Sequence, residues 1–412
     1  MQKITLVLIC SFVAANSDCV PGNETADQTD IQKNVGYLQY GSIHFALDMF
    51  RGLYNSSSNL FFSPLSIWIA LATVYAGSRH ETAKELATVL GISKIDLPLL
   101  PSTLSAFLDI CSDCKDSKSV VRIANRIYFQ EDIELELCGR QQEKMFHKID
   151  FKSDPERAST TINDFIENAT NGKIQELVPP QSIGPLTQMI IANAVYFKGI
   201  WEHQFNESMT RPARFYPNRE SYSTVPMMNT IGTYIYGSST QMDCQALELP
   251  YDGGTINMLI LLPRHSFRGL DILARTITPE RLENLLNSMT SEEVLITMPK
   301  FKVEEQYELS RTLKEIGLRS LFDPRFSDLS GFTSSRRLSI DAIHHKSYIK
   351  VNENGTEAAG ATGLLLSRDS HPLGITRFYA DRPFMYLIRD SYSKNLLFMG
   401  TIRNPRYTEN NY

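Results

Sequence analysis

Six runs rich in Val, Ile, Phe and Tyr constrain the fold of this chain more than any other feature. They cover Val120–Phe129, Met189–Phe197, Asn257–Leu262, Val294–Met298, Pro383–Ile388 and Asn395–Ile402. Each run is bounded by Gly, Pro, Asn or Asp, which is typical of strands. Helical spacing concentrates in the first half instead, in 43–50, 66–76 and 156–171. Because strands and helices do not alternate strictly, we expect an α+β fold rather than a doubly wound sheet.

The length and charge of the chain allow a large core and indicate no nucleic-acid or membrane partner. The chain has 412 residues, of which 42% are apolar and 21% are charged, and its formal net charge is −5. Length alone would predict two or three domains. A negative chain has no general attraction to nucleic acid or to an anionic membrane surface.

The first 15 residues have the pattern of a secretory signal peptide. Lys3 supplies the positive flank, residues 4–13 are mostly apolar, and Val13-Ala14-Ala15 offers small residues for cleavage. Residues 16–36 are polar, and we expect them to form a mobile N-terminal tail. The chain is therefore expected to be a secreted, extracellular glycoprotein, with sequons at Asn23, Asn55, Asn168, Asn206 and Asn354.

The cysteines indicate neither a metal site nor a disulfide scaffold. Loss of Cys10 with the signal peptide leaves Cys19, Cys111, Cys114, Cys138 and Cys244. An odd number leaves at least one cysteine unpaired or pairing between molecules. Cys111 and Cys114 have redox or metal spacing, but no second pair accompanies them. A local disulfide, or two thiols on a helix, explains them better.

Enzyme signatures are missing, so we expect a protein that is not an enzyme and uses no cofactor. The chain has no G-x-S-x-G, no G-x-x-x-x-G-K-[ST] and no H-E-x-x-H motif. His344 and His345 are adjacent, so in a strand they point to opposite faces, and we expect one of them to be buried and hydrogen-bonded. Basic residues do not cluster densely, so a heparin-type polyanion is not indicated as a partner.

The segment Glu353–Gly363 combines the composition of a loop with the pattern of a strand. Apart from two glutamates and one asparagine, its residues are all small. Every second position from Thr356 to Thr362 is uncharged, whereas Glu357 falls on the other face. This period of two is that of a strand with one buried side. A loop that can become a strand is a candidate conformational switch.

This segment and several motifs elsewhere resemble those of the serpins, the family of serine protease inhibitors. The segment resembles the hinge of the serpin reactive-centre loop, and the other motifs follow in the expected order. These motifs are Asn59–Ser66, Gly172–Ile174, Asn193–Trp201, Asp328–Gly331 and Phe378–Phe384. The resemblance covers roughly Val35 to Pro405. It implies one serpin domain at residues 37–412, with three β-sheets, eight or nine helices and an exposed reactive-centre loop at about 353–377.

The resemblance implies a suicide inhibitor of a serine protease. A protease would cleave the loop, become an acyl-enzyme, and be distorted when the loop inserts as a new strand into the central sheet. The implied hinge consists of Glu353, Gly355, Thr356, Glu357, Ala358, Ala359, Gly360, Ala361 and Thr362. A charge on its buried face would oppose insertion through desolvation, and none is present. This favours an inhibitor over the alternative, a non-inhibitory serpin that carries a ligand or binds a client.

Two polar clusters are implied by position in the family. Ser63, Ser66, Asn193 and His345 resemble the cluster at which the central sheet opens, which we call the sheet-opening cluster. Trp201, Lys300 and Glu353 resemble the insertion-start cluster, with Lys300 and Glu353 as an expected ion pair. The native state is then expected to be metastable and to persist for kinetic reasons.

The reactive bond is expected among Arg368, Asp369 and Ser370. Family spacing places it after Asp369, but a trypsin-like pocket carries a carboxylate that binds a guanidinium and repels an aspartate. We therefore expect cleavage after Arg368, in a covalent 1:1 complex between a monomeric inhibitor and a secreted trypsin-like protease. The Asp369–Ser370 bond stays open, and residues 364–366, all leucine, keep an elastase- or chymotrypsin-like target open. A glycan on Asn354 would block insertion, so we expect that sequon to be unoccupied.

Overall fold

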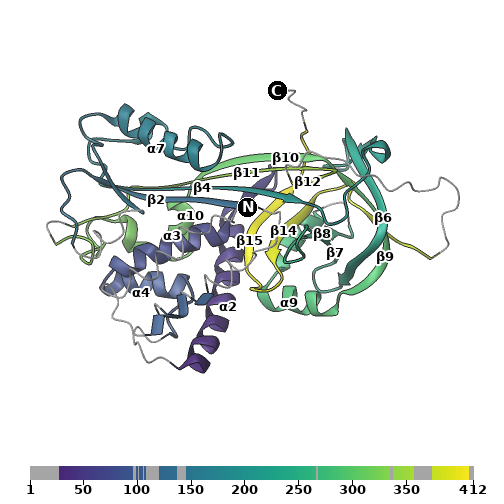
Figure 1. The fold of residues 1–412 in the computed structure, drawn as a ribbon, viewed down its shortest axis with the longest axis horizontal. Coiled ribbons are helices and arrows are strands. Elements are labelled where there is room, and N and C mark those ends of the chain that lie inside the picture. The colour runs from purple at the N-terminus through teal and green to yellow at the C-terminus, as the bar shows by residue number, and fades with distance from the viewer. Residues whose placement is uncertain are drawn as a thin grey trace.

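A six-stranded sheet runs along the long axis of the molecule (Figure 1). The computed structural model describes residues 27–95, 99–100, 102–104, 106–107, 120–136, 145–265, 268–334, 337–356 and 374–407. The sheet has the order β10-β11-β12-β4-β2-β3. Its strands are β2 (Val120–Gln130), β3 (Phe146–Ile149), β4 (Met189–Ile200), β10 (Phe301–Glu308), β11 (Ala342–Asn352) and β12 (Gly355–Thr356).

A second, nine-stranded sheet has the order β1-β15-β14-β8-β7-β6-β9-β13, with β5 paired to β6. Its strands are β1 (Leu60–Phe62), β5 (Arg211–Phe215), β6 (Ser223–Ser239), β7 (Cys244–Pro250), β8 (Ile256–Pro263), β9 (Thr290–Pro299), β13 (Thr376–Tyr379), β14 (Phe384–Asp390) and β15 (Leu396–Ile402). The 17 residues of β6 pair first with β5 and β9 and then, from Ile235, with β7. The expected α+β class is therefore present, and the described strands form two sheets, because the long β6 pairs with β5, β9 and β7 within a single sheet.

Helices lie on both faces of the six-stranded sheet. In Figure 1, α7 covers one face, and α2, α3 and α4 lie on the other side. The helices are α2 (Gln28–Leu53), α3 (Pro64–Gly77), α4 (His80–Val89), α7 (Pro155–Ala169), α8 (Gly269–Thr276), α9 (Pro279–Ser288) and α10 (Ser310–Glu315), with 3-10 turns η3 (Pro180–Ser182), η4 (Glu207–Met209) and η5 (Ser320–Phe322). α3 is buried nearly all round, as its uniformly apolar sequence predicts. Within the described residues, no helix is long and apolar enough to cross a membrane.

The N-terminal part of α2 differs from the expectation of a polar tail at residues 16–36. Residues 28–36 are helical, because Asp27 caps the helix by accepting a hydrogen bond from the Thr29 amide (3.0 Å), and because Asn34 and Val35 are buried. The prediction of a tail was wrong for residues 28–36, because it considered only their polar composition. The domain boundaries otherwise remain a prediction.

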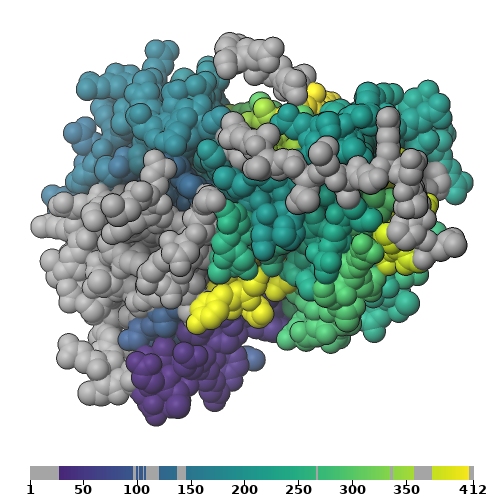
Figure 2. Space-filling model, turned by 45° about the vertical axis from the view of Figure 1, so that its right-hand side comes forward, coloured from purple at the N-terminus to yellow at the C-terminus, as the bar shows by residue number. Residues whose placement is uncertain are grey.

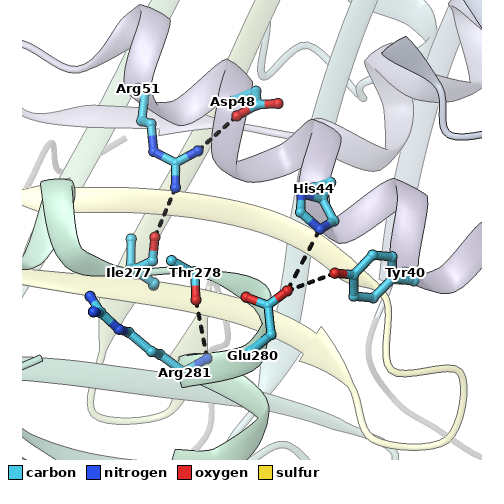
Figure 3. Close-up of polar contacts among 8 residues, drawn as sticks. All are labelled: Tyr40, His44, Asp48, Arg51, Ile277, Thr278, Glu280 and Arg281. Atoms are coloured by element: carbon cyan, nitrogen blue, oxygen red, sulfur yellow. Dashed lines mark hydrogen bonds and ion pairs between the residues drawn. The ribbon is translucent and has the colours of Figure 1, made fainter. Parts of the chain in front are cut away.

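Polar contacts tie α2 to α9 and to Ile277, in the link between α8 and α9 (Figure 3). The Tyr40 hydroxyl donates to Glu280 Oε1 (2.6 Å), and Arg51 Nη2 donates to the Ile277 carbonyl (2.8 Å). Figure 2 shows α2, in purple, beside the yellow C-terminal strands on the surface. These contacts hold α2 against α9, away from the strands that carry the candidate site.

Several expected features lie outside the described residues: the signal peptide at 1–15, Asn23, Cys19, Cys111, Cys114 and Cys138. Cys244 is described, and it is a free, buried thiol in β7. Burial raises the pKa of Cys244 to about 12, so its thiol stays protonated and poorly reactive.

Candidate site for strand insertion

The boundary between β4 and β11, which we call the seam, is closed over one part and parted over another. The two strands pair directly, in parallel register, from Ala342 opposite Ile190 to Tyr348 opposite Tyr196. Further along, β12 lies between them, and Thr356 pairs with both Gly199 of β4 and Val351 of β11. Gly355 and Thr356 of the expected hinge are therefore already a strand of this sheet.

A tight hairpin places β12 in the seam. β11 ends at Asn352, Glu353 and Asn354 form the turn, and Gly355 starts the return strand. Gly355 has φ +140°, and a Cβ there would lie 2.1 Å from the Gly199 carbonyl oxygen. Only glycine fits this close approach of two backbones.

The insertion-start cluster contains the expected ion pair. Lys300 Nζ lies 3.1 Å from Glu353 Oε2, and the two side chains are only 10% and 5% exposed. The Thr210 hydroxyl donates to the other oxygen, Glu353 Oε1 (2.7 Å). Because both charges are desolvated, removing either partner would leave the other buried and uncompensated, at a cost of about 3–5 kcal/mol.

Trp201 links the end of β11, through Tyr251, to the hinge strand. Its indole Nε1 donates to the Asn352 carbonyl (3.0 Å), and its ring stacks on Tyr251 with centroids 4.4 Å apart. The Tyr251 hydroxyl hydrogen-bonds the Thr356 hydroxyl (2.8 Å). Burial raises the pKa of Tyr251, so this hydroxyl is neutral. Sequence reasoning missed both Thr210 and Tyr251, since neither lies in a motif that points to the hinge.

Two residues of the sheet-opening cluster, Asn193 and His345, belong to a polar row across four strands of the six-stranded sheet. Asn125 of β2, Asn193 of β4, His345 of β11 and Tyr307 of β10 are successive register partners. Asn125 and Tyr307 were not predicted. Asn125 could have been found, because it is a polar residue in the middle of an apolar strand run. The row crosses the seam between Asn193 and His345.

Hydrogen bonds saturate the amide of Asn193. Its Nδ2 donates to Ser66 Oγ and to Asn125 Oδ1, and its Oδ1 contacts His345 Nδ1. The Ser63 amide donates to His345 Nε2 (3.2 Å). Since Nε2 accepts, the ring proton is on Nδ1, which donates to Asn193 across the seam. Burial lowers the pKa of His345 to about 3, so the imidazole is neutral.

The structure thus brings together Ser63, Ser66, Asn193 and His345, and separately Trp201, Lys300 and Glu353. Gly355 and Thr356 are placed in the seam. The other hinge residues, 357–362, and the reactive-bond residues Arg368, Asp369 and Ser370 lie outside the described residues. Among the sequons, Asn55 and Asn168 are exposed and Asn206 is half-buried, whereas Asn354 is only 7% exposed.

The fold and this seam define an α+β protein whose central sheet takes up the start of a loop that follows one of its own strands. A model of the family described as "Serpin (serine protease inhibitor)" matches residues 41–405. The chain belongs to the serpin family.

Curated relatives and solved structures cover nearly the whole chain. The leukocyte elastase inhibitor of Bos taurus is 34% identical over 380 residues, which are 89% of this chain and 99% of the relative. Uncleaved ovalbumin matches with a TM-score of 0.79 and 27% identity, covering 90% of this chain and 100% of that one. Serpin48 of Tenebrio molitor matches with a TM-score of 0.79 and 26% identity, covering 93% and 100%.

Proposed function

We propose that this chain is a secreted suicide inhibitor of a serine protease and not an enzyme. The observation that carries the proposal is the position of β12. Its two residues pair on both sides of the parted seam, so the loop that follows can continue as a strand. Strand addition to a sheet is a recognised way for a segment to bind.

The proposed reaction begins as an ordinary proteolysis. The serine oxygen of the protease attacks the Arg368 carbonyl, and the Arg368–Asp369 peptide bond breaks. The nitrogen of Asp369 takes up a proton and leaves as a new amino terminus, while Arg368 stays on the protease as an ester. Insertion of the freed loop must then precede hydrolysis of that ester. The complex is covalent and 1:1.

Insertion has a favourable balance of backbone hydrogen bonds. The closed part of the seam holds one parallel ladder, from Ile190 to Tyr196 on β4. A strand entering there replaces that ladder with two antiparallel ladders, one to each neighbour. Each additional hydrogen bond contributes about 0.5–1.5 kcal/mol net, and antiparallel pairing is slightly more stable per residue than parallel pairing. The extra ladder therefore favours the inserted state.

The register of β12 gives Thr362 a specific role in that state. Thr356 lies opposite Gly199 and Val351. Six residues further along each strand, Thr362 would lie opposite both Asn193 and His345. Its hydroxyl can donate and accept, so it can replace the hydrogen bond between these two side chains that insertion breaks. The hinge would thus supply the polar group that the opened row requires.

Arg368 supports a trypsin-like target, because its guanidinium suits a carboxylate-bearing specificity pocket. A second candidate is an elastase-like protease. It is favoured by the name of the bovine relative, leukocyte elastase inhibitor, and by the three leucines at 364–366.

Secretion is supported by the signal-like pattern of residues 1–15 and by the exposure of the Asn55 and Asn168 sequons. The burial of Asn354, in the turn beside Glu353, supports an unoccupied sequon there. Expression in secretory cells, followed by N-terminal sequencing and glycopeptide mapping, tests all three points. Retention of the whole chain inside the cell would contradict secretion.

The inhibitory function is tested by incubating the protein with trypsin and with pancreatic elastase. We expect a complex that survives denaturing electrophoresis, and a released C-terminal peptide that begins at Asp369. A peptide that begins at Ser370 would move the reactive bond by one residue. Cleavage by both proteases without any covalent complex would instead support a non-inhibitory serpin.

A further inference from the structure

Three exposed tyrosines gather beside the strand that follows the reactive-centre loop. Tyr216, Tyr222 and Tyr379 are 36%, 54% and 44% exposed. Tyr379 ends β13, whereas Tyr216 and Tyr222 flank the turn from β5 to β6. Together with Arg214 and Arg377 they form what we call the tyrosine–arginine patch. Large exposed aromatic side chains are normally scattered singly over a surface, so such a gathering needs an explanation.

Contacts within the patch make it one surface. The rings of Tyr216 and Tyr222 lie 6.2 Å apart, and the Arg214 guanidinium lies over the Tyr222 ring at 4.5 Å. The Tyr216 amide donates to the Asp381 carbonyl (2.7 Å), which ties the turn to the residues after β13. Burial and the nearby Asp381 and Tyr216 raise the pKa of Tyr379. Arg377 is exposed on the same face of β13, two residues before Tyr379.

The turn that carries two of the tyrosines is held in one conformation. The Asn218 side-chain oxygen accepts hydrogen bonds from the amides of Glu220 and Ser221 and from the Ser221 hydroxyl, each at 2.9 Å. Pro217 restricts the backbone directly after Tyr216. A surface that is ordered before binding loses little conformational entropy when a partner docks on it.

The tyrosine–arginine patch carries a net positive charge, although the net charge of the whole chain is negative. Residues 211–222 contain three arginines and one carboxylate, Glu220, and β13 adds Arg377. Asp381 is paired with Arg382 (3.0 Å). Glu293 of β9 lies beyond Arg377 on the side away from the tyrosines, as the register of β13 against β9 shows. A chain with a net charge of −5 thus presents a local cationic surface here.

The position of the patch brings it within reach of a protease at the reactive bond. Seven residues lie between Arg368 and Thr376, the first residue of β13, so eight chain steps separate them, which corresponds to at most about 29 Å of extended chain. A protease domain of roughly 220 residues has a radius of gyration of about 17 Å. A protease held at that bond therefore lies within about its own diameter of the patch.

We propose that the tyrosine–arginine patch is a docking site for the body of the target protease, outside the protease's active-site cleft, on an acidic surface of that protease. This inference rests on the proposed inhibitory function. Tyr and Arg are the residues enriched at the energetic centres of protein–protein interfaces. A polyanion would instead be met by lysines and arginines without exposed rings. The patch would add affinity and selectivity that the residues around Arg368 alone do not provide.

The test compares variants of the patch with a matched control. Tyr222→Ala, Tyr379→Ala and Arg214→Ala are assayed against trypsin or pancreatic elastase, whichever the unaltered protein traps faster. Tyr392→Ala, which removes a 70% exposed tyrosine elsewhere, is the control. We expect each patch variant to lower the second-order inhibition rate constant about tenfold. The number of inhibitor molecules used per protease should not change, because the patch lies outside the sheet that accepts the loop. Salt should slow the unaltered protein more than Arg214→Ala.

Direct binding separates failure of this inference from failure of the proposed function. Trypsin and pancreatic elastase are also prepared with their nucleophilic serine replaced by alanine, and their non-covalent affinity for the same variants is measured. Trapping with unchanged rates and affinities in all patch variants would overturn the docking site alone. Weakened binding in the patch variants, without any covalent complex, would support docking and contradict trapping. Loss of heparin binding in Arg214→Ala with unchanged protease kinetics would assign the patch to a polyanion and overturn our inference.

Discussion

Replacing Thr356 with arginine should convert the inhibitor into a substrate. Thr356 has no exposed surface, its hydroxyl is 2.8 Å from that of Tyr251, and β4 and β11 flank it on both sides. An arginine side chain at this position either enters the cluster as a buried cation without a designed partner or forces β12 out of the seam. Both outcomes oppose insertion.

The size of the effect follows from the desolvation of a charge. An uncompensated buried charge costs about 3–5 kcal/mol. If about 3 kcal/mol of this cost is present in the transition state for insertion, insertion slows by roughly 150-fold. Hydrolysis of the acyl-enzyme keeps its own rate, because the ester is chemically unchanged. Most encounters would then end with cleaved inhibitor and free protease.

The assay is a titration of a fixed amount of protease, read as residual activity and as bands on a denaturing gel. Thr356→Arg should use many inhibitor molecules per protease and should give mainly the cleaved form. Thr356→Ser is the matched control, because it keeps the hydroxyl that Tyr251 contacts and adds no charge. Equal stoichiometry for Thr356→Arg and the unaltered protein would refute the insertion mechanism.

Two further changes probe the polar clusters. Lys300→Met leaves the Glu353 carboxylate buried without its cation and should destabilise the native state by about 3–5 kcal/mol, as measured by thermal unfolding. Adding Glu353→Gln to this variant should restore part of the lost stability. An unaltered unfolding midpoint for Lys300→Met would argue against a structural role for the pair. The neutral state of His345 predicts a pH dependence of stability, because its folded pKa of about 3 lies below the unfolded value of about 6.5. Its contribution to the free energy of unfolding is present above pH 6.5 and is lost as the pH falls below that value, by about 2 kcal/mol at pH 5. Guanidinium unfolding at pH 5 and above pH 6.5 should show this loss of stability, and His345→Gln should lose less. Identical pH dependence in both proteins would contradict a buried neutral imidazole.

The predicted strands could be found because each is a run in the sequence that is rich in apolar, β-branched or aromatic residues. The run at 294–298, for example, is the buried part of β9, and the run at 189–197 is most of β4. The start of α2 was not predictable from polarity, because the burial of Asn34 and Val35 depends on what packs against them. Its Asp27 cap is a local contact and could have been found. The pairing of β6 with three different strands was also not predictable, since the sequence of one long strand does not specify its partners along its length.

The candidate site was predictable only where a residue belongs to a motif. Lys300 and Glu353 are far apart in sequence, and their resemblance to family positions was the sole indication that they meet. Thr210 and Tyr251 complete the same cluster through tertiary contacts alone. No periodicity or spacing in one sequence encodes such contacts, because they are set by the packing of separate elements.

The seam also makes the molecule vulnerable to its own copies. A strand that enters the seam needs only a free backbone, small uncharged side chains and a hydroxyl opposite Asn193 and His345. Segment 356–362 of a second molecule meets these requirements as well as the molecule's own segment does, because the two sequences are identical. What protects the monomer is that its own loop is tethered beside the seam at a high effective concentration. A change that weakens the polar row, such as acid acting on His345, would open an unpaired strand edge, and such edges template pairing between chains. Concentrated samples held at low pH should therefore form linear oligomers joined head to tail, and prior filling of the seam with a synthetic peptide of residues 356–366 should prevent their growth.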